Sequence, residues 1–394
     1  MIALTNGKII LKDKILDGHV LIINNEKIEK IIPSEEFSAG EDVEIIDCKD
    51  KYISPGIIDI HSDYIENIVS PRPTTMMDFE FALRETERIL VTSGITTMYH
   101  SISLNSLNNN SKKKVRHSEN VLNLVEEINE LDKKPHIIHN RVHIRYEISC
   151  IELIDEILRL ISENKIHLFS LMDHTPGQGQ YRNIEVYKEI KQSYNESLSE
   201  SDIEREIDQM IKSPKLLIED MKRLTDACKK NNITVASHDD DSIEKLSFNE
   251  NLGVKISEFP LTIEIAKEAR NKGFFTVAGA PNLLLGKSHS GNLSAKDGIK
   301  HGAISIISSD YYPSSMLYSL FKTSEELDIP LYEMFNMVTY NPAKAVGISD
   351  LYGSIEEGKN ADIIVIESFG KYPTIDTAMI DGRVVFRTEY RNEH

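Results

Sequence analysis

Histidine and carboxylate side chains stand directly after several short apolar runs of this sequence. His61 and Asp63 follow the largely apolar segment 57–60 and are two positions apart, so in a strand both side chains point to the same side. His174, His238 and Asp310 follow later apolar runs. Imidazole and carboxylate groups gathered from different strands are typical ligands of zinc, iron and manganese. The candidate metal ligands are His61, Asp63, Glu147, His174, His238 and Asp310.

The chemistry expected of such a set is hydrolysis by an activated water. A bound metal lowers the pKa of its water toward about 7, which makes hydroxide available at neutral pH. Glu147 is best placed to bridge two ions about 3.5–4 Å apart, and the choice between one ion and two stays open. Asp310 would bind a metal and accept the proton of the water, so Asp310 and His238 are the candidate catalytic residues. Zinc is the first choice, with iron and manganese as alternatives.

Each of these residues also has an ordinary structural interpretation. A single histidine such as His174 or His238 is more often a structural residue than a ligand, and His143 suits a barrel interior equally well. Asp239 and Asp240 can be interpreted as a solvated acidic run. The recurrence of ligand types at successive strand ends is what favours the metal site.

A second group of residues suits a phosphate-bearing ligand. Arg72 lies between Pro71 and Pro73, which keep the chain stiff and extended, and a fixed guanidinium binds phosphate well. Loops rich in glycine, serine and asparagine let backbone N–H groups approach phosphate oxygens. A salt bridge is the alternative for any single arginine. The candidate substrate-binding residues are Arg72, Arg145, Gln178, Asn282, Lys287, His289, Ser290 and Asn292.

The order of the chain predicts how these residues are positioned. Between residues 55 and 345, apolar strand candidates alternate with amphipathic helices, which is typical of a TIM-like (β/α)8 barrel of the α/β class. In such barrels the catalytic groups lie at the carboxyl ends of the strands. A doubly wound sheet is the alternative, but no GxGxxG follows the first strand. The predicted strands are 57–62, 96–101, 137–147, 166–173, 233–238, 254–259, 274–278 and 303–308.

The predicted barrel, residues 55–345, is the metal-dependent hydrolase domain. A helical insertion and a small terminal domain are predicted in addition. Residues 181–232 are expected to form a helical insertion, which either covers the barrel mouth as a lid or decorates the surface. Residues 1–54 and 346–394 contain short strands with turn signals between them. The simplest packing joins the two ends of the chain in one small β-sandwich domain beside the barrel.

Composition narrows the classes of function. The formal charge of −18 argues against nucleic-acid binding and means that any phosphate site must be a local cluster of cations and N–H groups. No apolar run is long enough to span a membrane, and no signal-peptide pattern is found at the N-terminus. The three scattered cysteines do not suggest disulfides or a cysteine zinc site, so we expect a cytoplasmic protein.

These motifs, taken in order, resemble the amidohydrolase superfamily and, within it, the α-D-ribose 1-methylphosphonate 5-triphosphate diphosphatases of the carbon–phosphorus lyase pathway. The resemblance covers essentially the whole chain. The motifs that carry it include Pro55-Gly56-x-x-Asp59-x-His61, Ser70-Pro71-Arg72-Pro73, Asp173-His174-Thr175-Pro176-Gly177-Gln178, Ser237-His238-Asp239-Asp240, Gly279-Ala280-Pro281-Asn282, Ser288-His289-Ser290-Gly291-Asn292, Ser309-Asp310-Tyr311-Tyr312 and Gly353-x-Ile355-x-x-Gly358-Lys359-x-Ala361-Asp362-Ile363.

The resemblance implies a metal-dependent hydrolysis of a small triphosphorylated ribose phosphonate. The products would be the 5-phosphate and pyrophosphate, formed by cleavage between the α and β phosphates. Two alternatives stay open: another amidohydrolase reaction, on a cyclic amide or as a deaminase, and a non-catalytic metal-binding subunit of a phosphonate-processing assembly. A homo-oligomer is compatible with the sequence.

The sequence departs from the usual superfamily pattern in two ways. The usual His-x-His is replaced by His61-x-Asp63. The superfamily's other histidines follow strands five and six, whereas His174 and His238 follow the fourth and fifth predicted strands. Either the strand count slips by one, or the site is rearranged.

Overall fold

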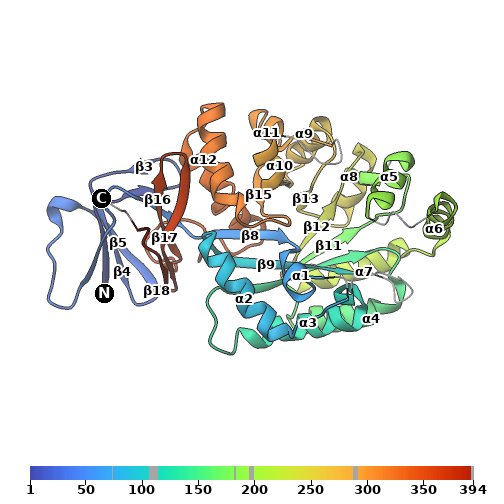
Figure 1. Cartoon of the computed structure of the whole chain (residues 1–394), viewed down its shortest axis with the longest axis horizontal. Helices are drawn as coiled ribbons and strands as arrows, with labels where there is room; N and C mark the ends of the chain where they lie inside the picture. Colours follow the sequence, from blue (N-terminus) through green and yellow to red (C-terminus); the bar gives the residue numbers. More distant parts are fainter. Residues whose placement is uncertain (73, 106–113, 182, 195–198, 287–291, 392–394) are drawn as a thin grey trace.

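The chain folds into a parallel barrel with small antiparallel-rich sheets beside it (Figure 1). The computed structural model describes residues 1–72, 74–105, 114–181, 183–194, 199–286 and 292–391. The eight barrel strands neighbour one another in chain order, which confirms the predicted α/β barrel. They are β8 (Ile57–Ser62), β9 (Ile95–Leu104), β10 (His139–Glu147), β11 (Leu168–Met172), β12 (Thr234–His238), β13 (Ile256–Glu258), β14 (Phe275–Gly279) and β15 (Ile306–Ser308).

Backbone contacts connect the last strand of the barrel, β15, to the first, β8. Ser62 at the end of β8 forms a parallel bridge with Asp310, two residues beyond β15. The Asp310 N–H donates to the His61 carbonyl, and the Asp63 N–H donates to the Asp310 carbonyl, each with an N···O distance of 3.0 Å. Two candidate ligands at the start of the barrel and one at its end are therefore held by backbone hydrogen bonds.

The barrel interior changes from apolar to polar along the strands. Ile256 and Ala236 belong to a buried apolar cluster. Glu258 and His238 lie two residues further along the same strands, so their side chains point to the same face. A fully buried side chain of the size of Ile256 stabilises the fold by about 1.5–3 kcal/mol. The barrel interior therefore has an apolar layer, followed by a polar layer at the carboxyl ends of the strands.

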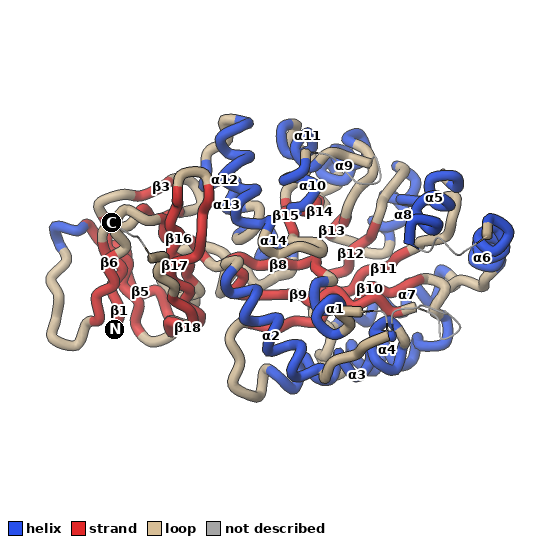
Figure 2. The backbone as a smooth tube through the Cα atoms, viewed as in Figure 1, coloured by secondary structure: helices blue, strands red, loops and turns tan. Residues whose placement is uncertain are grey.

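Amphipathic helices cover the barrel (Figure 2). Their apolar faces and the outer faces of the strands share large buried clusters, as expected for a β/α alternation. The helices are α1 (Tyr64–Val69), α2 (Phe79–Thr92), α3 (Ser118–Leu131), α4 (Ile154–Ser162), α5 (Ile184–Tyr194), α6 (Glu200–Lys212), α7 (Ile218–Lys230), α8 (Ile243–Asn251), α9 (Ile263–Asn271), α10 (Ala280–Leu285), α11 (Ala295–Lys300), α12 (Ser315–Leu327), α13 (Leu331–Asn336) and α14 (Tyr340–Ala345).

The region predicted as a helical insertion, 181–232, contains helices of two kinds. Met221 and Leu224 of α7 join the main buried cluster, so α7 is the outer helix that precedes β12. Helices α5 and α6 instead share a small cluster of their own, formed by Tyr187, Ile203 and Ile207. The insertion into the β/α order is thus the α5–α6 pair. No helix in the described part of the chain combines the length and apolarity that a membrane crossing requires.

The two ends of the chain meet in the additional sheets. One sheet has the order β5-β4-β1-β6, and the other has the order β18-β17-β16-β7-β2-β3. In the second sheet, β16 from the C-terminal part pairs antiparallel with β7, which leads directly into the barrel. The strands are β1 (Ile2–Thr5), β2 (Lys8–Ile10), β3 (Ile15–Leu16), β4 (His19–Asn24), β5 (Lys27–Pro33), β6 (Glu44–Asp47), β7 (Tyr52–Pro55), β16 (Ile363–Phe369), β17 (Tyr372–Ile380) and β18 (Arg383–Arg387).

Candidate active site

A large cavity opens where the carboxyl ends of the barrel strands meet. Its volume is about 1110 Å³. All six candidate metal ligands line it, and they are His61, Asp63, Glu147, His174, His238 and Asp310. His174 follows β11 and His238 ends β12, so the strand count predicted from the sequence is correct. The histidines therefore follow the fourth and fifth strands of the barrel.

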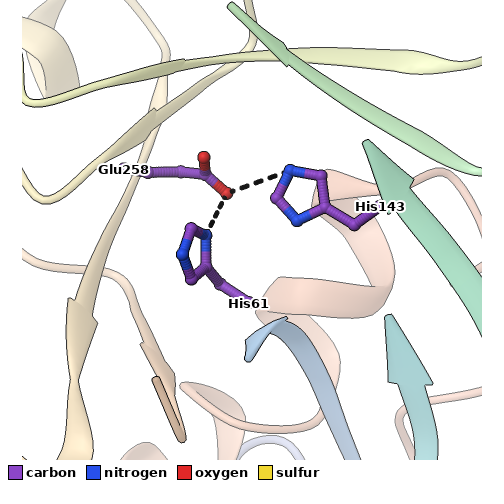
Figure 3. A group of neighbouring side chains, drawn as sticks. All are labelled: His61, His143 and Glu258. Atoms are coloured by element: carbon purple, nitrogen blue, oxygen red, sulfur yellow. Dashed lines mark hydrogen bonds and ion pairs between the residues drawn. The ribbon is translucent and has the colours of Figure 1, made fainter. Parts of the chain in front are cut away.

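One group of ligand-type side chains is buried, and of its three members His61 lines the cavity (Figure 3). His61 Nδ1 lies 2.8 Å from Glu258 Oε1, and His143 Nε2 lies 3.7 Å from the same oxygen. The Ser170 hydroxyl donates to the other Glu258 oxygen at 2.7 Å. A carboxylate that fixes one nitrogen of an imidazole leaves the other nitrogen free to face a metal. Glu258 is therefore able either to bind a metal itself or to orient His61 toward one.

A second group lies beside it and links four side chains from neighbouring strand ends. His174 Nδ1 contacts Glu147, and His174 Nε2 lies 3.6 Å from Asp239 Oδ2. The same Asp239 oxygen lies 2.9 Å from His238 Nδ1. The rings of His61 and His238 are 5.4 Å apart between their centroids, so the two groups adjoin. Asp239 has a left-handed backbone with φ of 53°, and this turn brings its side chain back to the histidines.

Burial and ion pairing set the charges of the histidines. Burial opposes the charged form of His174, but the carboxylates of Glu147 and Asp239 outweigh it and raise its pKa to about 9. Burial lowers the pKa of His238 to about 4 and that of His143 to about 3. Neutral imidazoles are ready to bind a metal, whereas His174 must release a proton first. Metal binding at the second group is thus coupled to proton release.

The carboxylates of both groups are held in their charged forms. Burial opposes the charge of Glu258, but the neighbouring His61 outweighs it and lowers the pKa of that carboxyl. Burial likewise opposes the charge of Asp239 and Glu147, while His238 and His174 lower the pKa of Asp239, and His174 lowers that of Glu147. Charged carboxylates buried beside imidazoles form a donor set that a divalent cation neutralises.

Two atoms test whether these residues fit a metal. His238 Nδ1 and Asp239 Oδ2 are buried and lie 2.9 Å apart, and neither has a hydrogen-bond partner among the described residues. Burying polar atoms without partners is costly, and nearly all such atoms in folded proteins are paired. A cation bound between the two side chains would satisfy both atoms. The residues present therefore fit a divalent metal, which is what the donor types in both groups indicate.

The predicted substrate-binding residues do not all line the cavity. Arg145, Asn282 and Asn292 line the cavity. The Gln178 amide is hydrogen-bonded to Asp173, and Arg72 is exposed; neither lines the cavity. Lys287, His289 and Ser290 lie outside the described residues.

Some site residues were not identified from the sequence. Glu258 ends β13 and is completely buried, and its position after an apolar strand was the available signal. Asp239 is buried among histidines and is not part of a solvated run, so that interpretation was wrong. Arg116 lines the cavity from a short 3₁₀ helix and pairs with Glu66 at 2.8 Å and Asp63 at 3.5 Å. No sequence signal pointed to Arg116.

Comparisons with known proteins identify the family of this chain. Residues 52–385 match the model of the amidohydrolase family, and residues 1–49 match a NagA composite domain. The chain is 29% identical over 386 residues to the alpha-D-ribose 1-methylphosphonate 5-triphosphate diphosphatase of Escherichia coli (strain K12), which covers 97% of this chain and 100% of that protein. A probable imidazolonepropionase of Xenopus laevis is 28% identical over 109 residues, or 24% of this chain and 25% of that protein.

Solved structures share the fold at low sequence identity. An N-acetylglucosamine-6-phosphate deacetylase from Pasteurella multocida superposes with a TM-score of 0.67 at 14% identity, covering 97% of this chain and 98% of that chain. A molinate hydrolase superposes with a TM-score of 0.66 at 13% identity, covering 98% and 94%. These similarities concern the fold alone.

Proposed function

This chain belongs to the amidohydrolase family, and we propose that it hydrolyses α-D-ribose 1-methylphosphonate 5-triphosphate to the 5-phosphate and pyrophosphate in phosphonate catabolism. The observation that carries the proposal is the match along the full length of the Escherichia coli diphosphatase. The ligand-type side chains around one large cavity support it, because they suit metal-assisted hydrolysis.

The proposed reaction uses water as the nucleophile. A divalent metal, zinc being the first choice, supplies an acidified water and neutralises phosphate charge when it is bound. His61, His174, His238 and the carboxylates beside them would hold it. The water oxygen forms a bond to phosphorus, the anhydride bond between the α and β phosphates breaks, and pyrophosphate leaves. Asp310 accepts the proton of the water at the end of the eighth strand.

The substrate carries several negative charges, so the cavity must offer cations. Arg116, Arg145 and Lys191 line it. Arg116 is already paired with Glu66, and Lys191 is paired with Glu206. Within the described residues, no carboxylate lies within ion-pair distance of Arg145; its Nη2 lies 3.2 Å from His238 Nε2, and its Nε is buried without a hydrogen-bond partner. Arg145 is therefore the cation that is best prepared to bind a phosphate.

A cytoplasmic location is part of the same proposal. Cys48, Cys150 and Cys228 are buried free thiols, and burial raises the pKa of each to about 12. Free thiols of this kind suit a reducing compartment.

The direct test is product analysis with metal-stripped protein. We expect zinc, iron or manganese to restore release of pyrophosphate from the ribose 5-triphosphate, with no direct formation of orthophosphate. Protein kept in chelator is the control. Metal-dependent turnover of a cyclic amide in place of the triphosphate would replace the proposal with another amidohydrolase reaction. Folded, metal-loaded protein that turns over neither substrate would contradict catalysis.

We expect Arg145→Lys to raise the KM for the triphosphate by about tenfold, with a smaller change in kcat. Lysine keeps the charge but loses the two-pronged hydrogen bonding of a guanidinium, and a hydrogen bond to a charged group contributes about 1.5–3 kcal/mol. Steady-state kinetics of pyrophosphate release measures the effect.

The matched control for this variant is Arg141→Lys on the same strand. Arg141 pairs with Asp132 at 2.6 Å and does not line the cavity, so the KM should stay at the wild-type value. Arg72→Ala tests the residue predicted from the sequence as a phosphate anchor. A raised KM for Arg72→Ala together with an unchanged KM for Arg145→Lys would mean that Arg72, in the loop after α1, binds the phosphate in place of Arg145.

A further inference from the structure

A third group of ligand-type side chains lies far from the cavity, at the foot of the barrel. His139 is the first residue of β10, Asp362 directly precedes β16, and Asp381 lies in the turn between β17 and β18. Glu147, at the cavity end of β10, is eight residues later, which is about 26 Å at about 3.3 Å per residue. The group therefore joins the barrel to the sheet that both ends of the chain build.

The donor atoms of this group converge on one point. His139 Nε2 lies 3.1 Å from Asp362 Oδ2 and 3.7 Å from Asp381 Oδ2. Around a tetrahedral zinc with bonds of about 2.0–2.2 Å, neighbouring donor atoms are about 3.3–3.6 Å apart. The two separations bracket this range, so small shifts of the side chains would complete three corners of a tetrahedron.

Two of the three donor atoms have no hydrogen-bond partner. His139 is 8% exposed and Asp362 is 6% exposed, and His139 Nε2 and Asp362 Oδ2 are buried without a partner among the described residues. They lie within ion-pair distance of each other, yet they do not form a hydrogen bond. A cation bound between these two buried atoms would give both of them a partner.

The other oxygen of each aspartate already accepts a hydrogen bond, as is usual for carboxylates that bind a metal. Asp362 Oδ1 accepts the Asp381 N–H at 2.9 Å, and Asp381 Oδ1 accepts the Asn360 amide at 3.0 Å. The Tyr352 ring packs against the His139 ring with centroids 5.1 Å apart. Each aspartate is thus held with its second oxygen toward His139. The Asp381 side chain is 34% exposed, which gives an ion a path from solvent.

We propose that His139, Asp362 and Asp381 hold a divalent cation, zinc fitting the donor set best, which clamps the barrel to the terminal sheet. A neutral imidazole and two carboxylates balance the charge of such an ion, and a water completes the coordination. Burial opposes the charged form of His139, but Asp362 and Asp381 outweigh it and raise its pKa, so an ion bound here would displace a proton from the imidazole. The site is independent of the hydrolytic reaction, since it lies at the opposite end of β10.

The test compares zinc binding by metal-stripped wild-type protein and Asp381→Asn. Asparagine keeps the shape of this half-exposed turn residue and tolerates its φ of 47°, so the variant should fold. We expect Asp381→Asn to bind one equivalent of zinc fewer by calorimetric titration. We also expect it to lose part of the zinc-dependent rise in unfolding temperature, while kcat for pyrophosphate release stays unchanged.

The matched control is Asp376→Asn, which changes a carboxylate of the same strand pair that is bound to Lys51. This variant should bind as much zinc as the wild type. Equal zinc binding by wild type and Asp381→Asn would overturn the proposal. Anomalous diffraction at the zinc edge gives a second test: a peak among the three side chains supports the site, and an empty map in zinc-soaked crystals overturns it.

Discussion

We expect Asp310→Asn to lower kcat for pyrophosphate release by about 10³-fold while the protein stays folded. A general base typically contributes 10²–10⁴-fold, and an amide cannot accept the proton of the attacking water. Asn is among the residues that tolerate a left-handed backbone, which matters because Asp310 has a φ of 58°. The backbone hydrogen bonds that join Asp310 to His61 and Asp63 are independent of the substituted atom.

The measurement is steady-state turnover with metal content and circular dichroism recorded on the same samples. Asp328→Asn is the control, because it makes the same substitution at an exposed residue with a φ of 55° at the end of α12. The control should retain wild-type turnover. Turnover of Asp310→Asn within a few-fold of the wild type would remove Asp310 from the role of base.

The strand ends were predictable from the sequence because local pattern determines them. Apolar runs that end in His61, His174 or His238 give both the element and the position of its polar end. A β/α alternation then brings those ends to one face of a barrel, so a cavity lined by the predicted ligands follows from topology alone. The terminal strands predicted that the two ends of the chain would pack together, but the pairing of β7 with β16 was not predicted.

The pairing between side chains was not predictable in the same way. Asp239 faces His174 because its own backbone, directly after β12, is left-handed. Neither the charge nor the hydropathy of the sequence predicts that turn. Glu258 stands on an apolar strand but acquires its role from His61, which is 197 residues away. Arg72 and Arg145 carry the same guanidinium, and the three-dimensional arrangement determines which of them lines the cavity. Contacts of this kind come from long-range packing, which one sequence does not encode locally.

The second large effect is expected for Glu258→Gln, which should weaken metal binding by about 10–100-fold, the usual consequence of losing a partner of a metal-bound histidine. Glutamine keeps the volume and still accepts a hydrogen bond from His61, but it removes the charge that lies 2.8 Å from His61 Nδ1. A chelator-competition titration measures the affinity. Saturating metal should restore most of the activity, in contrast to Asp310→Asn, whose defect is in the chemical step.

Asp240→Asn separates this effect from general loosening of the strand ends. Asp240 is also a fully buried carboxylate, but it accepts hydrogen bonds from the Ser237 hydroxyl at 2.6 Å and from the Asn249 amide at 2.8 Å. We expect its substitution to lower the unfolding temperature and to leave metal affinity unchanged. An equal loss of affinity in both variants would mean that Glu258 acts through stability alone. Loss of a whole metal equivalent only in Glu258→Gln would make Glu258 itself a ligand, because a residue that merely orients His61 lowers affinity without removing a site.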